Sequence, residues 1–326
     1  MNRPYSGCSN KPGDLVGRDP RSRRVRANAI AGVDQGVLKG RTKFIKGYLF
    51  AAPLLVILSL AVLFPALYNL GIAFYDYNLT SNSWRFIGLQ NFAKLGSSPI
   101  FWNSFKVTLL WVAGNVSLQL VVGLAIALGL NSIIWFRGPF TGILLIPWIS
   151  SFVVVGILFI WIYDPQMGVL NDILLRLGLI ENPVAWLASP HLAQTSLIAA
   201  NTWKFFPLVM ITLLAGLQDV SPELVEATQV DGANWLGTFR MVIFPTILPS
   251  ISTGVLLSTI WAYNSFTLPI VMTGGGPLRA TEIFGLYIFK LAFDAFDFGA
   301  AAAASLILFI QILIVIVLYL KVVERD

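Results

Sequence analysis

Two apolar segments of this sequence carry polar and aromatic side chains at the i, i+3, i+4 and i+7 spacing that gathers residues on one side of a helix. The first face consists of Asn201, Lys204, Phe205 and Leu208. The second face consists of Ser258, Trp261, Ala262 and Ser265, with Asn264 beside them. Polar groups can hydrogen-bond the hydroxyls of a sugar-like solute, and rings can stack on its C–H faces. These faces are candidates for a solute pathway, and packing between helices is the alternative.

Lys204 lies near the middle of its apolar segment, where a buried ammonium without partners would be costly. It must therefore face water, a protein partner or the solute, and in the last case it could favour an acidic saccharide. Asn115 and Gln119 form a similar i, i+4 pair on an earlier segment. We expect that pair to bond one helix to another.

The composition predicts an integral membrane protein. The chain has 326 residues, of which 56% are hydrophobic and 12% charged, whereas a soluble domain carries about 25% charged residues. Six apolar runs are long enough to cross the hydrocarbon core as helices. They are Tyr48–Tyr75, Phe105–Asn131, Pro139–Tyr163, Leu192–Leu217, Thr246–Val271 and Gly299–Val322. Because backbone groups must pair within lipid, the predicted fold is all-α with about six transmembrane helices.

Basic residues are concentrated at the amino-terminal end of the chain. Of the 22 lysines and arginines, eleven precede Gly47. A basic segment beside the first span is the positive-inside signal, so residues 1–46 are predicted to form a disordered cytoplasmic tail. Residues 47–326 then form the transmembrane domain, with both termini on the cytoplasmic side of the membrane. The tail explains the net charge of +6 without a nucleic-acid partner.

The residues that most enzymes need are missing. One cysteine, Cys8, and one histidine, His191, allow no intramolecular disulfide and predict no metal site. Without a Gly-x4-Gly-Lys-Ser/Thr loop for nucleotide phosphates, the chain is predicted to bind no cofactor and to have no catalytic residue. A membrane enzyme would need clustered carboxylates or histidines. A self-sufficient secondary transporter is an alternative. The sequence has no obvious internal repeat, which argues against it.

The segment 219–249, between the fourth and fifth predicted spans, departs from the positive-inside pattern. Its charged residues are Asp219, Glu223, Glu226, Asp231 and Arg240. An acidic loop assigned to the cytoplasm suits a protein partner better than anionic lipid. The segment is thus a candidate docking element.

Local signals divide this segment into two helices. A hydroxyl N-cap at Ser221 and a proline after it predict a helix that runs to about Val230. Gly232 permits a reversal, and Asp231 is predicted to cap a second helix. That helix presents Trp235, Phe239 and then Val242 or Ile243 on one apolar face, and Pro245 and Pro249 are predicted to end it. Such a helix could lie in the membrane interface or insert into a partner's groove.

The same segment closely resembles the cytoplasmic loop motif of permease subunits in binding-protein-dependent ABC importers. The family pattern is Glu-Ala-Ala, three residues, Asp-Gly-Ala, then spaced Phe, Ile, Pro and Pro. The matching residues are Glu226, Ala227, Asp231, Gly232, Ala233, Phe239, Ile243, Pro245 and Pro249, with Thr228 in place of the second alanine. Further likenesses to the carbohydrate-uptake branch include Gly88–Phe92, Trp203-Lys204 with Pro207, and Thr273–Pro277.

The resemblance implies a coupling helix that docks on a separate ATPase. The implied contact residues are Glu226, Ala227, Asp231, Gly232, Ala233, Trp235 and Phe239. Glu226 would pair with a basic group of the ATPase, and Gly232 would hold the hinge. The implied complex contains a second, non-identical permease, two cytoplasmic subunits that bind ATP and Mg²⁺, and an external solute-binding protein. The implied solute is a sugar or oligosaccharide, with glycerol-3-phosphate or an acidic, alginate-type oligosaccharide as alternatives.

Overall fold

The computed structural model describes residues 51–80, 83–132 and 136–323. The predicted tail, residues 1–46, lies outside the described residues. The chain divides into two units, residues 1–67 and residues 68–326. In the described part of the first unit, an apolar helix begins at Ala51 and continues to Ile72 of the second unit.

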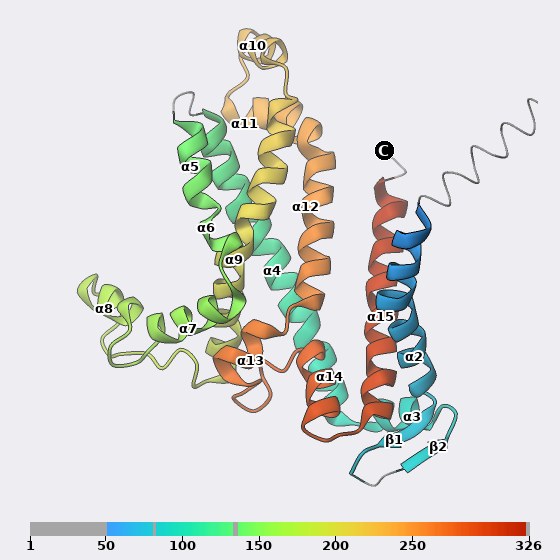
Figure 1. Cartoon of the computed structure of the whole chain (residues 1–326). Helices are drawn as coiled ribbons and strands as arrows, with labels where there is room; N and C mark the ends of the chain where they lie inside the picture. Colours follow the sequence, from blue (N-terminus) through green and yellow to red (C-terminus); the bar gives the residue numbers. More distant parts are fainter. Residues whose placement is uncertain (1–50, 81–82, 133–135, 324–326) are drawn as a thin grey trace, which may run out of the picture. The chain divides into compact units, whose positions relative to one another are not determined.

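The described elements are almost all helical (Figure 1). In chain order they are η1 (Ser59–Leu63), α2 (Phe64–Ile72), β1 (Tyr75–Asn78), β2 (Ser83–Phe86), α3 (Gln90–Ser97), α4 (Pro99–Ser132), α5 (Arg137–Leu144), α6 (Ile146–Ile149), α7 (Phe152–Ile162), α8 (Val169–Arg176), α9 (Pro190–Gln218), α10 (Pro222–Val230), α11 (Trp235–Thr238), η2 (Phe239–Ile243), α12 (Phe244–Asn264), α13 (Thr267–Thr273), α14 (Phe284–Phe293) and α15 (Phe298–Val323). The two η segments are π-helical. Strands β1 and β2 form an antiparallel hairpin in which Tyr75 pairs with Phe86.

Within the described residues, five helices are long and apolar enough to cross a membrane, or six if one bent pair counts as a span. The predicted all-α membrane fold is therefore confirmed. The predicted fourth span, Leu192–Leu217, lies inside α9 and differs from it by two residues at one end and one at the other. The serine before α9, Ser189, accepts a hydrogen bond from the Leu192 amide and fixes its start.

The third predicted span, Pro139–Tyr163, is not one straight helix. Residues Arg137–Ile149 and Phe152–Ile162 form two helical pieces that meet at 93°. The chain between them is extended, with ψ of 147° at Ser150 and 141° at Ser151. The predicted run therefore corresponds to a bent pair of helices. Hydrogen bonds from a distant helix hold the break, as the next subsection describes.

The fifth span also differs from its prediction. Residues Trp235–Asn264 form one continuous helix, so Pro245 and Pro249 do not end the docking segment. The wider π-helical turn of η2 precedes Pro245. A π-turn can accommodate a proline that would otherwise break the hydrogen-bond ladder. The helix ends at Asn264 instead of Val271, and α13 follows separately.

Helices α4, α9 and α12 lie side by side and form the core of the second unit (Figure 1). One buried cluster joins Ala127 and Leu130 of α4 to Val209 and Leu213 of α9 and to Ile247 of α12. Gly216 lets α9 approach α12 closely, since a Cβ there would lie 2.7 Å from Ser250 Cβ. This three-helix core positions both regions singled out from the sequence.

Candidate functional site

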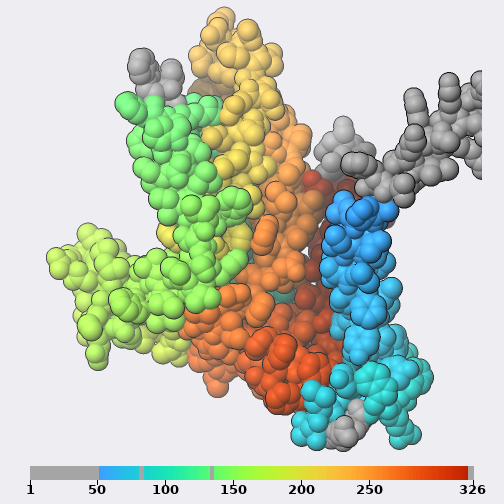
Figure 2. Space-filling view, viewed as in Figure 1, coloured from blue at the N-terminus to red at the C-terminus, as the bar shows by residue number. Residues whose placement is uncertain are grey.

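The α10–α11 segment, Pro222–Thr238, projects from one end of the second unit (Figures 1 and 2). Helix α10 covers Pro222–Val230, as predicted. The predicted hydroxyl cap is absent: Ser221 Oγ accepts no hydrogen bond from the first amides of the helix, and its hydroxyl donates to the Glu223 carboxylate. That bond lowers the pKa of Glu223 below its ordinary value.

A tight backbone turn separates the two helices. The amides of Asp231 and Gly232 donate to Ala227 and Gln229 carbonyl oxygens, each at 3.0 Å. Gly232 has a φ of +83°, the left-handed conformation for which glycine was predicted. The prediction that Asp231 caps the second helix was wrong. Asp231 ends α10, and Asn234 is the cap, with its side chain accepting from the Gly237 amide at 2.9 Å.

The two helices are tied together beneath an apolar surface. Thr228 of α10 and Thr238 of α11 have their hydroxyls 3.1 Å apart. Thr228, the residue that departs from the family pattern, thus points toward α11. The ring of Trp235 stacks on Phe239 with centroids 5.6 Å apart, yet Trp235 is 66% exposed. Leu224, Val230 and Leu236 are exposed on the same segment.

The predicted acidic contact is available at this surface. Glu226 and Ala227 are exposed, as are Asp231 and Gly232, whereas Ala233 is half-buried. Among the described residues, none forms an ion pair with Glu226. A cationic group on another molecule could therefore bind this carboxylate without displacing an internal partner.

The polar face of α9 is turned inward against α4. Asn201 Nδ2 donates to Asn115 Oδ1 at 2.6 Å, and Asn115 Nδ2 donates to the Trp111 carbonyl oxygen at 2.8 Å. Gln119 Nε2 also donates to Asn115 Oδ1, at 3.3 Å. All these residues are buried. Asn115 thus bonds α4 to Asn201 of α9 as expected, whereas Gln119 bonds Asn115 of its own helix.

Lys204 is buried against the break between α6 and α7. Its Nζ lies 2.5 Å from the carbonyl oxygen of Ser150, 3.2 Å from that of Trp148 and 3.5 Å from that of Pro147. The centroid of the Phe152 ring lies 4.4 Å from Nζ. A helix that ends leaves its last carbonyl groups unpaired, at the negative end of its dipole. A lysine there donates to the carbonyl groups and places its positive charge beside the negative end. The three donors of the ammonium are thereby engaged.

Aromatic rings connect Lys204 to the surface of α12. Phe205, next in sequence, is buried and packs between Phe152 and Trp261, with centroids 5.6 Å from each. Trp261 is 44% exposed, and Asn264 is exposed three residues later. Ser258 and Ser265 are buried. Of the predicted solute-facing residues, Trp261 and Asn264 therefore reach the surface of this chain.

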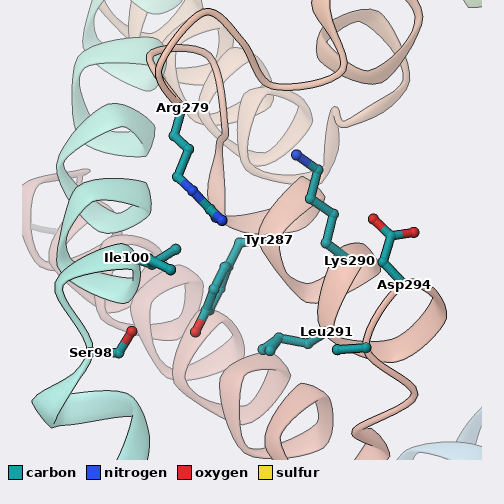
Figure 3. A pocket seen from close by; sticks show the side chains of 8 residues that line it. Ser98, Ile100, Arg279, Tyr287, Lys290, Leu291 and Asp294 are labelled. Carbon is teal, nitrogen blue, oxygen red and sulfur yellow. The ribbon is translucent and has the colours of Figure 1, made fainter.

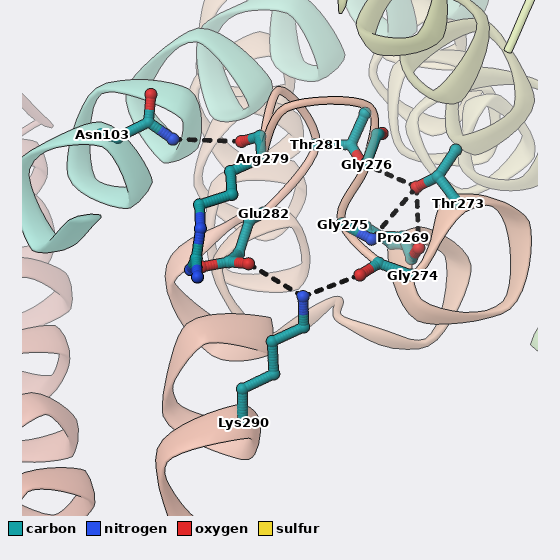
Figure 4. A network of polar contacts seen from close by, with 10 residues as sticks. All are labelled: Asn103, Pro269, Thr273, Gly274, Gly275, Gly276, Arg279, Thr281, Glu282 and Lys290. Carbon is teal, nitrogen blue, oxygen red and sulfur yellow. Dashed lines mark hydrogen bonds and ion pairs between the residues drawn. The ribbon is translucent and has the colours of Figure 1, made fainter. Parts of the chain in front are cut away.

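Sequence reasoning missed a charged cluster at the end of the second unit opposite α10. Glu282 is fully buried and binds two cations, Arg279 Nη1 and Lys290 Nζ, each at 2.8 Å (Figure 4). Arg279 and Lys290 also line a cleft of about 510 Å³, together with Tyr287, Ser98 and Asp294 (Figure 3). The i, i+3 spacing of Arg279 and Glu282 was the available signal. Among the described residues, no group of histidine, cysteine and carboxylate side chains could hold a metal ion.

The spans, the broken helix and the projecting α10–α11 segment define a multi-pass membrane permease. The profile of the family described as "Binding-protein-dependent transport system inner membrane component" matches residues 119–325. The chain belongs to this family.

Curated relatives cover most of the chain. The sulfoquinovosyl glycerol transport system permease protein SmoG of Agrobacterium fabrum is 32% identical over 84% of this chain and 89% of its own length. The trehalose/maltose transport system permease protein MalF of Thermococcus litoralis is 33% identical over 85% and 92%. The lactose transport system permease protein LacF of Rhizobium radiobacter is 31% identical over 76% and 84%.

The fold has a counterpart among solved structures. A chain of a bacterial ABC transporter involved in import of the acidic polysaccharide alginate superposes with a TM-score of 0.73 at 24% identity, covering 87% of this chain and 98% of that one. This similarity shows a shared fold. The chain is thus an inner-membrane permease subunit of a binding-protein-dependent transport system.

Proposed function

We propose that this chain forms half of the pathway by which a sugar or oligosaccharide crosses the inner membrane. The observation that carries the substrate class is that SmoG, MalF and LacF, all more than 30% identical, are named for transport of glycosides or disaccharides. The other half of the pathway belongs to a second, non-identical permease, and a solute-binding protein delivers the solute. Trp261 and Asn264 supply an aromatic face beside an amide, which suits a saccharide.

The α10–α11 segment is the docking element for a separate ATP-binding subunit. The segment exposes Trp235 and Leu236, and it exposes Glu226, with which none of the described residues forms an ion pair. An apolar helix face with an orienting charge is a common form of helix-in-groove recognition. The proposed complex has two such ATPase subunits, which bind ATP and Mg²⁺, and this chain binds no cofactor.

The topology follows from this docking. The α10–α11 segment and the carboxyl end of α15 lie at the same end of the second unit (Figure 1). Placing the ATPase in the cytoplasm therefore places the carboxyl terminus there. Six spans and the basic amino-terminal segment put the amino terminus on the same side.

Continuity of α11, η2 and α12 supports a mechanical link between ATP and solute. The 30-residue helix Trp235–Asn264 is about 45 Å long at 1.5 Å per residue. Its two ends carry Trp235, at the docking surface, and Trp261, on the solute face. ATP binding can shift the conformational equilibrium only if the docked ATPases favour one state of the permease. Movement of one end of this helix would then reorient the other.

Measurements of ATP hydrolysis and solute uptake by the reconstituted complex test the proposal. Solute-loaded binding protein should stimulate ATP hydrolysis and drive uptake of at least one saccharide from a panel of neutral and acidic sugars. Uptake without ATP but with an imposed proton or sodium gradient would instead indicate a secondary transporter. Stimulation by non-carbohydrate solutes alone would overturn the proposed substrate class.

A further inference from the structure

A cleft at the end of the second unit opposite α10 combines charges of both signs with apolar walls (Figures 1 and 3). Its volume of about 510 Å³ lies within the range of about 300–1,000 Å³ that is usual for small-molecule sites. Ser98 and Ile100 line it from the junction of α3 and α4, and residues of α14 and of the loops beside that helix line the rest. Its apolar walls are Ile100 and Leu291.

Two cations at this cleft have donors to spare. Arg279 binds Glu282 through Nη1, and among the described residues no acceptor engages its Nε or Nη2. Lys290 Nζ binds Glu282 and the Gly274 carbonyl oxygen, which leaves one of its three hydrogens. Both cations are held in place by the buried carboxylate of Glu282. Guanidinium and ammonium groups with free donors suit a phosphate.

A carboxylate lies across the cleft from the guanidinium. Arg279 and Asp294 are on opposite sides (Figure 3). Asp294 is exposed, and among the described residues none forms an ion pair with it. The cations of Arg279 and Lys290 are balanced by the carboxylates of Glu282 and Asp294, so the cleft carries no net charge. A ligand with both an anionic and a cationic group therefore suits it better than a simple anion.

The position of the cleft along the spans places it at the level of lipid headgroups. Ile100 lies five residues before Phe105, where the predicted apolar run of α4 begins, which is about 7.5 Å along a helix. Asp294 lies five residues before Gly299, where the predicted apolar run of α15 begins. The headgroup layer extends about 5–7 Å beyond the hydrocarbon core on each side. Lipid headgroups are therefore the zwitterions that meet this cleft at high concentration.

An exposed tryptophan beside the cleft agrees with this depth. Trp102, two residues after Ile100, is 54% exposed. Its indole Nε1 donates to the Gly96 carbonyl oxygen at 2.8 Å, so the polar edge of the ring is satisfied while its apolar face stays open. Tryptophan is enriched at the boundary between hydrocarbon and water for this reason.

We propose that the cleft binds the headgroup of a phosphatidylethanolamine from the leaflet opposite α10. Arg279 and Lys290 bind its phosphate, and the Asp294 carboxylate accepts from its ammonium. Ile100 and Leu291 contact the glycerol and the first acyl carbons. Phosphatidylcholine has no N–H donor for Asp294, and phosphatidylglycerol has no cation for it. This inference goes beyond the transport function and does not depend on which solute is carried.

Lipid retention by the purified importer complex tests the inference. The complex is depleted of lipid, exposed to equal amounts of phosphatidylethanolamine, phosphatidylcholine and phosphatidylglycerol with identical acyl chains, and examined by native mass spectrometry. Phosphatidylethanolamine should be retained with at least fivefold higher occupancy than either other lipid. Equal retention of the three lipids, or preference for one of the other two, would overturn the inference.

Substitution of the unpaired carboxylate assigns the retained lipid to this cleft. Asp294→Asn should lower the occupancy of phosphatidylethanolamine at least fivefold and leave that of phosphatidylcholine unchanged. The variant should still assemble, because the Asp294 side chain is exposed and has no ion pair within the described residues. Glu181→Gln makes the same charge change at an exposed carboxylate away from the cleft and should retain the lipid. Native occupancy in Asp294→Asn would contradict the proposal.

A photoreactive lipid locates the site and distinguishes a lipid from a soluble zwitterion. Phosphatidylethanolamine with a diazirine on its first acyl carbons should label peptides that contain Ile100 or Leu291, and this labelling should fall at least fivefold in Asp294→Asn. Adducts confined to other peptides would overturn the assignment. O-Phosphoethanolamine, which has the same phosphate and ammonium without acyl chains, should not compete at millimolar concentration. Efficient competition would indicate a soluble ligand and overturn the lipid proposal.

Discussion

The ammonium of Lys204 on α9 lies 2.5 Å from the carbonyl oxygen of Ser150, the last residue before the chain turns between α6 and α7. A cation from one helix thus caps the broken end of another. Removing it would leave the partly buried carbonyl groups at the break without this donor. Lys204 therefore stabilises the bend of the third span in this conformation.

Lys204→Met should destabilise the break. Loss of the donor costs about 1–3 kcal/mol for each buried acceptor left unpaired, so the α6–α7 angle should become heterogeneous. Spin labels at Ile143 and Ile157, both exposed and on opposite arms of the break, would report this by pulsed electron resonance as a broadened distance distribution. Lys106→Met, which removes an exposed lysine on α4, is the matched control. An unchanged distribution in Lys204→Met would refute the capping role.

Charge reversal at Glu226 should uncouple the permease from its ATPase. Glu226→Lys would place a cation where the proposed partner presents one, so co-purification of the ATPase should fall at least tenfold and uptake should be lost. The chain should still insert, since the Glu226 side chain is exposed and has no internal ion pair. Asp219→Lys makes the same charge change at an exposed position outside α10 and should retain the ATPase. Normal co-purification of Glu226→Lys would remove the basis for the docking proposal.

The hinge at Gly232 provides a test of backbone conformation alone. Its φ is +83°, and a Cβ added there would meet no atom within 4 Å. Valine at position 232 would be strained in the left-handed conformation by about 1–2 kcal/mol. Gly232→Val should therefore weaken ATPase association roughly five- to thirtyfold. Asparagine tolerates this conformation, so Gly232→Asn should retain most of the association. Equal behaviour of the two variants would show that the turn conformation is not what matters.

Elements governed by local pattern were predictable. The apolar length of α9 placed its ends within two residues, and the glycine at the hinge has the predicted left-handed backbone. The helix α10 likewise follows from Pro222 and the residues after it. In each case the determining residues lie within a few positions of the feature that they determine.

Features that depend on distant residues were not predictable in this way. The break at Ser150 is held by Lys204, 54 residues away, and within the apolar run only Pro147, Ser150 and Ser151 mark it locally. The helix continues past Pro245 because the π-turn of η2 adapts the ladder, whereas proline alone predicts an end. Asn201 has the spacing of a solute-facing residue, and only the position of Asn115 on α4 turns it into an interhelical contact.

Among the residues of the two predicted solute faces, Trp261 has the largest exposed ring. Removing this ring should raise the KM for uptake of the solute. Its ring is backed by buried Phe205 at 5.6 Å between centroids, so the exposed side is a fixed stacking surface. Loss of such a contact costs about 1 kcal/mol, which predicts an increase of roughly fivefold in the KM for uptake in Trp261→Ala. Trp261→Phe should recover part of this. Trp161→Ala, at a 73% exposed tryptophan on α7, is the control and should leave KM unchanged. A native KM in Trp261→Ala would move the pathway away from this face of α12, toward the partner permease.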